Sequence, residues 1–419
     1  MLYAAGYRLE KNGFSIQRTG IFIIDSKPKG AKIFINGRPQ ETWSSSIFNK
    51  KNYITTPAKI KNLLPGEYDL RLELDGYWSW QKKLTVNPGA STFAENIYLF
   101  KNDLPIQVIP AAIESIDLSP NNNQAVIFSS DLITFLNLSD ESQKTVKRND
   151  LTEKNIFWSM DQNKIIIDNY LYNLADLASA IDLKKLAPNP SNYKWSGNIL
   201  YFQDKNSIYQ FDLSNTSKKI IDNKIFDDYL IKNNYLYLII KSSQAANLEV
   251  IDMTTGQSLK NINLPAAINY TFINTEQNLL NLYDSGHKIL YLINPASTYE
   301  PLVEIINNIK TTLWTDSNNL LYTNDFEIWL YNLETKSKTL ITRISDTINN
   351  AILHPSKDYI IYSTKQTINA IELDKREKRN STELIKLDSI DSFILTKDNI
   401  LYFLGKIGNL EGLYKFLIQ

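Results

Sequence analysis

The feature that most constrains the fold is a repeat that fills the chain beyond about residue 104, with a period of about 35 to 40 residues. Each unit has a short apolar stretch, a polar Asp/Asn turn, a strongly apolar stretch, another turn, and a stretch of the form apolar-x-apolar-Asp/Asn-Leu. The units begin at Ser115, Ile156, Tyr193, Tyr229, Tyr270, Thr312, Ala351 and Phe393. Their period-two apolar pattern predicts strands, so the repeat predicts stacked β-units.

A repeat of this length fits one four-stranded blade, and the eight units therefore predict a β-propeller of eight blades. The eighth unit reaches the end of the chain before a fourth strand can form. Residues 104–110, "LPIQVIP", have strand character, and we expect them to pair with the last blade and close the ring, which removes exposed strand edges. Seven blades is the alternative if the second unit, with its insertion at 173–187, is an elaborated loop.

The turns after the first strand of several units resemble those of TolB-type and WD40-like propeller repeats, which carry a Trp-Ser-Pro-Asp-Gly-like sequence there. The corresponding sequences are "LSPNNN" (118–123), "WSMDQN" (158–163), "WTDSNN" (314–319) and "HPSKD" (354–358). The resemblance covers about 310 residues and implies architecture alone, because propellers host enzymes, adaptors and scaffolds alike.

The segment before the repeat has a different pattern of short alternating strands separated by tight turns. Turn sequences stand at Asn36-Gly37, Pro65-Gly66, Asp75-Gly76 and Pro88-Gly89. Four such turns within about 80 residues separate five to seven short strands, which predicts a small β-sandwich.

This segment resembles the PEGA domain, a small β-sandwich of bacterial and archaeal surface proteins. The resemblance rests on "SKPKGAKIFINGRP", "TTPAKIKNLLPGEYDLRLELDGYWSWQKKLTVNPG" and "ENIYL". The naming tetrad reads Pro28-Lys29-Gly30-Ala31, with lysine in place of glutamate. The resemblance implies a cell-envelope protein, commonly beside a membrane anchor, that binds protein or carbohydrate.

Three regions follow from these patterns: an N-terminal linker at 1–20, a PEGA-like β-sandwich at 21–102 and a β-propeller at 103–419. The linker opens with "MLYAAGYRLEKNG", a short apolar stretch before basic and polar residues. We treat it as the possible end of an omitted membrane anchor, as a hypothesis. No stretch of about 18 apolar residues occurs, so the sequence itself predicts no membrane span.

Composition and motifs argue against several functional classes. Lys+Arg and Asp+Glu both number 45, so there is no basic field for nucleic acid. Cysteine is absent, which excludes thiol catalysis and disulfides, and the two histidines, His287 and His354, stand far apart. No nucleophile elbow, phosphate loop, zinc-protease motif or EF-hand occurs. We therefore expect no enzyme activity, cofactor or metal.

The aromatic residues Tyr77, Trp78 and Trp80 follow the Asp75-Gly76 turn and are the candidate binding residues. Tyr77 and Trp80 are most simply read as closing the sandwich core. At least one of the three is expected near the surface, where it could stack on a sugar or a partner. The basic segment 374–380, "DKREKRN", is read as a solvated hairpin tip rather than an anion-binding site.

The sequence therefore predicts a non-catalytic, extracytoplasmic protein of the bacterial surface or envelope. Its propeller would bind a protein or glycan, and its PEGA-like domain would serve as spacer or second binding module. The alternative is a polysaccharide hydrolase with a dispersed pair of carboxylates in the propeller funnel.

Overall fold

The structure is a computed structural model of the chain that describes residues 6–9, 16–42, 52–110, 113–120, 123–148, 155–213, 216–241, 246–273, 275 and 277–419. The chain divides into two compact units. Unit 1 comprises Met1–Ala112, Asp325–Glu327 and Ile341–Gln419, and unit 2 comprises Ile113–Asn324 and Ile328–Leu340. Each unit is described by itself.

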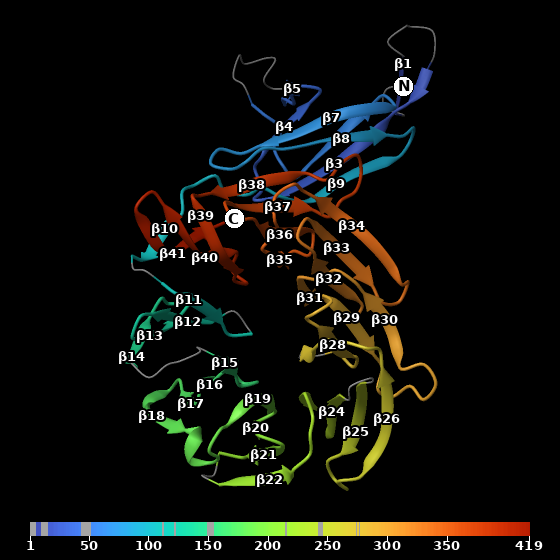
Figure 1. Cartoon of the computed structure of the whole chain (residues 1–419). Helices are drawn as coiled ribbons and strands as arrows, with labels where there is room; N and C mark the ends of the chain where they lie inside the picture. The colour runs from blue at the N-terminus through green and yellow to red at the C-terminus, as the bar shows by residue number, and fades with distance from the viewer. Residues whose placement is uncertain are drawn as a thin grey trace. The chain divides into compact units, whose positions relative to one another are not determined.

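Unit 1 opens with a short hairpin followed by two packed sheets (Figure 1). The hairpin pairs β1 (Tyr7–Leu9) with β2 (Ile16–Arg18). One sheet has the order β6-β3-β9 and the other β5-β4-β7-β8. Their strands are β3 (Gly20–Lys27), β4 (Lys32–Ile35), β5 (Arg38–Pro39), β6 (Ala58–Leu63), β7 (Gly66–Glu73), β8 (Trp80–Val86) and β9 (Ser91–Tyr98).

The alternation of apolar and polar side chains along these strands explains why they form a sandwich. In β8 every second side chain, from Trp80 to Val86, is buried and the ones between are exposed. The inward residues of both sheets form one apolar core, which includes Phe22, Ile33 and Leu72. The Asn36-Gly37 turn joins β4 to β5, and both of its residues have positive φ, as a two-residue hairpin turn requires.

Unit 1 also contains two four-stranded antiparallel sheets. One has the order β35-β36-β37-β38, and the other β10-β41-β40-β39, so the strand from residues 106–109 lies beside the last strand of the chain. The strands are β10 (Ile106–Ile109), β35 (Asn350–Leu353), β36 (Tyr359–Ser363), β37 (Thr367–Glu372), β38 (Ser381–Lys386), β39 (Ser389–Leu395), β40 (Ile400–Ile407) and β41 (Leu410–Leu417).

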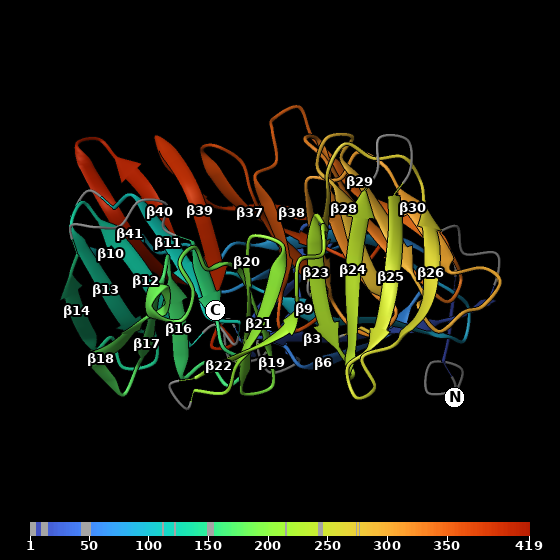
Figure 2. The ribbon, with the colours of Figure 1, turned by 60° about the horizontal axis from the view of Figure 1, so that its bottom comes forward.

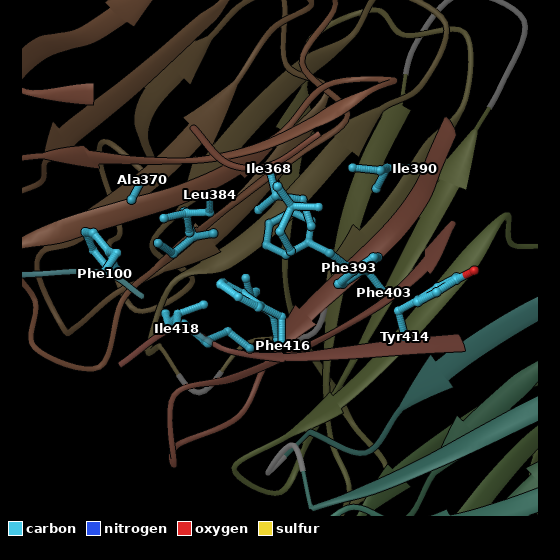
Figure 3. Packing of buried hydrophobic residues seen from close by; sticks show 14 of the residues in the cluster. Phe100, Ile368, Ala370, Leu384, Ile390, Phe393, Phe403, Tyr414, Phe416 and Ile418 are labelled. Atoms are coloured by element: carbon cyan, nitrogen blue, oxygen red, sulfur yellow. The ribbon is translucent and has the colours of Figure 1, made fainter. Parts of the chain in front are cut away.

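An apolar cluster joins these two sheets to the end of the sandwich (Figure 3). It gathers Phe393, Phe403 and Phe416 with Phe100, which follows β9. The backbone N–H of Lys101 donates to Ile418 O at 2.9 Å. The connection after the sandwich is therefore built into the core of these sheets.

Unit 2 contains further four-stranded antiparallel sheets, each made of four consecutive strands. The first three are formed by β11 (Ser115–Leu118), β12 (Gln124–Ser129), β13 (Leu132–Asn137) and β14 (Gln143–Lys147); β15 (Ile156–Trp158), β16 (Lys164–Ile167), β17 (Tyr170–Asn173) and β18 (Asp176–Asp182); and β19 (Ser191–Ser196), β20 (Ile199–Asp204), β21 (Ser207–Phe211) and β22 (Ser217–Ile221). A 3₁₀ turn, Leu183–Lys185, follows β18, so segment 173–187 forms a strand and a turn.

Three further sheets follow, and Figure 2 shows β23, β24, β25 and β26 in order across one of them. They are formed by β23 (Asp228–Lys232), β24 (Tyr235–Lys241), β25 (Ala246–Asp252) and β26 (Ser258–Leu264); β27 (Tyr270–Ile273), β28 (Leu280–Asp284), β29 (Ile289–Ile293) and β30 (Leu302–Ile306); and β31 (Thr311–Trp314), β32 (Asn319–Thr323), β33 (Glu327–Asn332) and β34 (Ser337–Arg343). Glu327 and residues 341–343 of the last sheet are counted with unit 1.

Repeated four-stranded meanders of this kind are propeller blades, and the cores between successive sheets hold them together. The number of blades and the domain limits at 1–20, 21–102 and 103–419 stay predictions. No helix in the described residues is both long and apolar enough to cross a membrane.

Candidate functional site

The three aromatic residues singled out in the sequence lie at the start of β8 and just before it. Trp80 is 6% exposed and belongs to the sandwich core, and Tyr77 packs half-buried against the same core. Trp78 is 43% exposed. The structure thus brings Tyr77 and Trp80 together in packing, and it leaves Trp78 as the one of the three whose ring is offered to solvent. Their role in binding stays a prediction.

Trp80 and Lys82, on the inward face of β8, meet the carboxylate of Glu372 at the end of β37. The indole Nε1 of Trp80 donates to Glu372 Oε2 at 3.1 Å. The Lys82 ammonium, which is fully buried, forms an ion pair with Glu372 and donates to the backbone oxygen of Asp374 at 2.9 Å. This pair was not predicted from the sequence. The alternation of buried and exposed residues in β8 could have indicated it, because this alternation places Lys82 on the inward face between Trp80 and Leu84.

The segment 374–380 connects the paired strands β37 and β38, and its residues 375–378 are exposed, as expected for a solvated hairpin tip, but it also makes contacts that we did not predict. Arg376 forms hydrogen bonds to the Asp374 carboxylate and donates to Phe93 O on β9 at 2.7 Å. Glu377 accepts the backbone N–H of Lys83 at 2.8 Å. Burial alone would raise the pKa of Asp374, but the hydrogen bonds from Arg376 outweigh it and the pKa is lowered. This segment therefore contacts the sandwich.

A pocket of about 340 Å³ lies beside this contact, with Glu95, Asp358, Glu372 and Asp374 among its lining residues. Glu372 and Asp374 are already engaged by Lys82 and neighbouring donors. Burial raises the pKa of Asp358. Within the described residues, no group of three or more His, Asp or Glu side chains is placed to hold a metal ion. The pocket is best explained as space left where the sandwich meets the β35–β38 sheet.

A larger pocket of about 620 Å³ lies in unit 2 between the sheets β23–β26 and β27–β30. We call it the tyrosine pocket, and it is lined by Lys232, Asn233, Tyr235, Tyr237, Val250, Leu259, Lys260, Asn278, Asn294, Pro295 and Ala296. Its volume falls within the roughly 300–1,000 Å³ typical of small-ligand sites. None of these lining residues is a carboxylate.

Strand register explains how the tyrosine pocket is built. Tyr237 on β24 pairs with Val250 on β25, and Val250 pairs with Lys260 on β26, so the three side chains form a row across one face of the sheet. Tyr235 lies two residues before Tyr237 and therefore on the same face, with the two ring centroids 6.4 Å apart. Lys232, paired with Tyr235, extends the wall toward β23.

The polar atoms of the pocket are arranged by the turns at its rim. Lys260 Nζ donates to Ser297 O at 3.1 Å, and Lys232 Nζ donates to Thr275 O at 2.7 Å. Asn294 Oδ1 accepts the N–H of Ala296 at 3.0 Å. These residues were not predicted from the sequence. The alternation in "YLYLII" from Tyr235 was visible, but the pairing that sets Lys260 beside it was not.

The two histidines occupy different environments. His354 is buried and packs edge-on against Tyr98, Phe100 and Tyr359, while its Nδ1 contacts the Ser356 hydroxyl at 2.9 Å. His354 therefore packs in the core and caps its own turn. The His287 side chain is about half exposed, and its Nδ1 lies 2.6 Å from Asp284 Oδ2.

Tryptophans at or near the ends of the first strands of three sheets pack in apolar clusters. Trp195 is buried in an apolar cluster, and Trp158 and Trp314 pack against two others. Trp158 Nε1 also donates to Asp117 Oδ1 at 2.8 Å. Burial raises the pKa of Asp117, and this hydrogen bond lowers it in part.

Comparison with known families and structures supports this architecture. Residues 44–97 match the PEGA domain, which lies within the sandwich segment. No curated protein matches the chain in sequence. The structure of the Dos1 propeller matches with a TM-score of 0.51 at 12% identity, over 75% of this chain and 94% of that one. A crystal structure of the eukaryotic initiation factor matches with a TM-score of 0.51 at 10% identity, over 72% and 83%.

At such low identity the solved structures show the fold alone. The predicted fold class is confirmed: the protein is all-β, with a PEGA domain followed by a β-propeller.

Proposed function

We propose that this is a non-catalytic binding protein of the bacterial surface or envelope, whose propeller recognises a protein or glycan partner at the tyrosine pocket. The PEGA domain serves as spacer or as a second binding module through Trp78. The observation that carries the proposal is the composition of the tyrosine pocket: an aromatic wall, three amides and two lysines surround a volume of about 620 Å³. Pockets with a few convergent polar groups on an apolar wall are the usual form of a binding site.

The residues that line the two pockets also bear on the alternative function, a polysaccharide hydrolase. A glycosidase needs two carboxyl groups at a catalytic separation, and the tyrosine pocket has none among its described lining residues. The smaller pocket of unit 1 does contain carboxylates, but Lys82 and Arg376 engage two of them. This favours recognition over hydrolysis.

The proposed location rests on the PEGA domain, because domains of this family are typically extracytoplasmic and commonly stand beside a membrane anchor. We therefore propose that the protein stands outside the cytoplasm and faces outward from the membrane. The chain has no cysteine, so outside the cytoplasm it would be stable without disulfides.

A pull-down of bacterial cell-envelope fractions and a glycan array, both with the intact chain, test the proposal. Tyr235→Ala removes an aromatic wall of the tyrosine pocket and should abolish most of the binding. Tyr209→Ala is the matched control, since Tyr209 is also half-buried but lies on β21. Equal binding by the two variants and the unchanged protein would exclude the tyrosine pocket.

Point variants are preferable to a fragment without the sandwich. Such a fragment would leave Glu372 without its Lys82 partner, so lost binding could reflect lost folding. Trp78→Ala tests the second module in the intact chain, because Trp78 is largely exposed. Release of reducing ends from envelope polysaccharide by the intact protein would instead support the hydrolase.

A further inference from the structure

The hydroxyl groups of the tyrosine pocket are available to a ligand. Tyr237 is 4% exposed and lines the pocket, yet its hydroxyl has no hydrogen-bond partner within the described residues, and the same holds for Tyr235. Burial raises the pKa of Tyr237, so its phenol stays protonated at neutral pH and can donate. The Tyr237 hydroxyl can therefore pair with a ligand oxygen at the surface of the pocket.

The charge of the pocket favours an anion. In the part of the chain that the structure describes, Lys260 contacts the Ser297 carbonyl and no carboxylate. A carbonyl oxygen orients the Lys260 ammonium but carries no net negative charge. Asp252, the cross-strand neighbour of Tyr235, does not line the pocket, and its carboxylate accepts N–H groups of the turn that follows β25.

The remaining wall suits a ring with both polar and apolar faces. Leu259, Val250 and Pro295 supply apolar surface, and Tyr235 supplies an aromatic face. The side chains of Asn233 and Asn278 are exposed at the rim and have no hydrogen-bond partner among the described residues. Each amide can both donate and accept, as sugar hydroxyls can. A peptide recognised by strand addition would instead need a free sheet edge, whereas this row lies on a sheet face.

We propose that the tyrosine pocket binds a carboxylate-bearing saccharide, with the carboxylate on Lys260, a hydroxyl on Tyr237 and the sugar ring against Tyr235. This inference rests on the proposed function and names its ligand class. In the row Tyr237, Val250 and Lys260, the phenol donor and the ammonium lie on either side of the apolar Val250 side chain. A sugar acid can contact both groups, because its carboxylate and its hydroxyls are attached to different atoms of the ring.

The test is calorimetric titration of the intact chain with oligomers of galacturonate and glucuronate, beside galactose and glucose oligomers of equal length. Binding of the acidic oligomers alone is expected, and it should weaken as salt rises. Lys260→Gln should weaken it on the order of tenfold or more, because a charge-assisted hydrogen bond is lost. Tyr237→Phe keeps the ring and should weaken it about two- to tenfold.

The matched controls are Lys219→Gln and Tyr209→Phe. Lys219 lies over the Tyr209 ring on the sheet β19–β22, so this pair reproduces a lysine beside a tyrosine outside the pocket. Both controls should bind the acidic oligomers as the unchanged protein does. Unaltered unfolding midpoints of all four variants will show that changes in affinity are not changes in folding.

Four outcomes overturn the inference. Equal affinity for neutral and acidic oligomers would show that the pocket does not recognise a carboxylate. An unchanged affinity of Lys260→Gln would show the same for Lys260. Absence of all saccharide binding, while Tyr235→Ala still abolishes capture of an envelope protein, overturns the saccharide but leaves the proposed function standing. If Tyr235→Ala leaves envelope capture unchanged as well, both fail.

Discussion

The ammonium of Lys82 in the PEGA domain is fully buried against the carboxylate of Glu372, 290 positions later in the chain at the end of β37. Trp80 Nε1 and the backbone N–H of Asn380 also donate to this carboxylate. A buried charge of this kind is tolerated because every oxygen has a donor. The pair therefore joins the sandwich to the β35–β38 sheet within unit 1.

Lys82→Met should destabilise the protein by about 3–5 kcal/mol, because it leaves Glu372 buried without its countercharge. Chemical unfolding of the intact chain measures the effect. The control is Lys83→Met, since Lys83 is exposed on the same strand and the change should stay within about 0.5 kcal/mol. The double change Lys82→Met with Glu372→Gln should cost less than the sum of the single changes. Equal unfolding of the Lys82 and Lys83 variants would contradict the role of the pair.

His354 should make the stability of unit 1 depend on pH. Burial lowers its pKa from 6.5 to about 4, and the side chain of Asn399, which favours the protonated ring, opposes this shift only in part. Between these values the unfolded chain binds a proton that the folded one does not, so stability falls as pH drops from about 6.5 to about 4. The shift corresponds to roughly 3 kcal/mol in total.

Denaturant midpoints at several pH values from 4.5 to 7.5 measure this dependence. His354→Gln should flatten the profile in that window, because the titrating group is gone. His287→Gln should leave the profile steep, since His354 is still present. A profile that is equally steep in the His354 variant would assign the pH dependence to other groups.

The sequence predicted much of the fold but little of the site, for a physical reason. Strand alternation and turn sequences are local, and they were enough for the repeated sheets and for the sandwich. The tyrosine pocket depends on the register that sets Tyr237 opposite Val250 and Val250 opposite Lys260, and register between strands is not a local property. Lys82 was missed because a lysine is read as exposed until its partner, Glu372, is known.

Gly412 should be required where β10 pairs with β41. Its φ is 157°, and an added Cβ would lie 2.1 Å from Ile109 O. Gly412→Ala must therefore displace β10, at a cost of roughly 1–3 kcal/mol. Amide hydrogen exchange of residues 106–109 should accelerate. Gly408→Asn is the control, because no atom lies within 4 Å of a Cβ there and asparagine tolerates its positive φ; if it accelerates exchange equally, the close approach is not the cause.

Substitutions of Trp78 and Trp80 should have different effects, because Trp80 contributes to stability and Trp78 is the candidate binding residue. Trp80→Phe keeps an aromatic ring in the core but removes the donor to Glu372, which leaves a buried carboxylate oxygen without that partner; a loss of about 1–3 kcal/mol is expected in chemical unfolding. Trp78→Ala should leave the unfolding midpoint nearly unchanged, because the ring is largely exposed. If Trp78→Ala also leaves envelope capture unchanged while Tyr235→Ala abolishes it, the PEGA domain is a spacer. A loss of capture in Trp78→Ala at normal stability would instead make this domain a second binding module, since a folded protein that no longer binds has lost a contact rather than its structure.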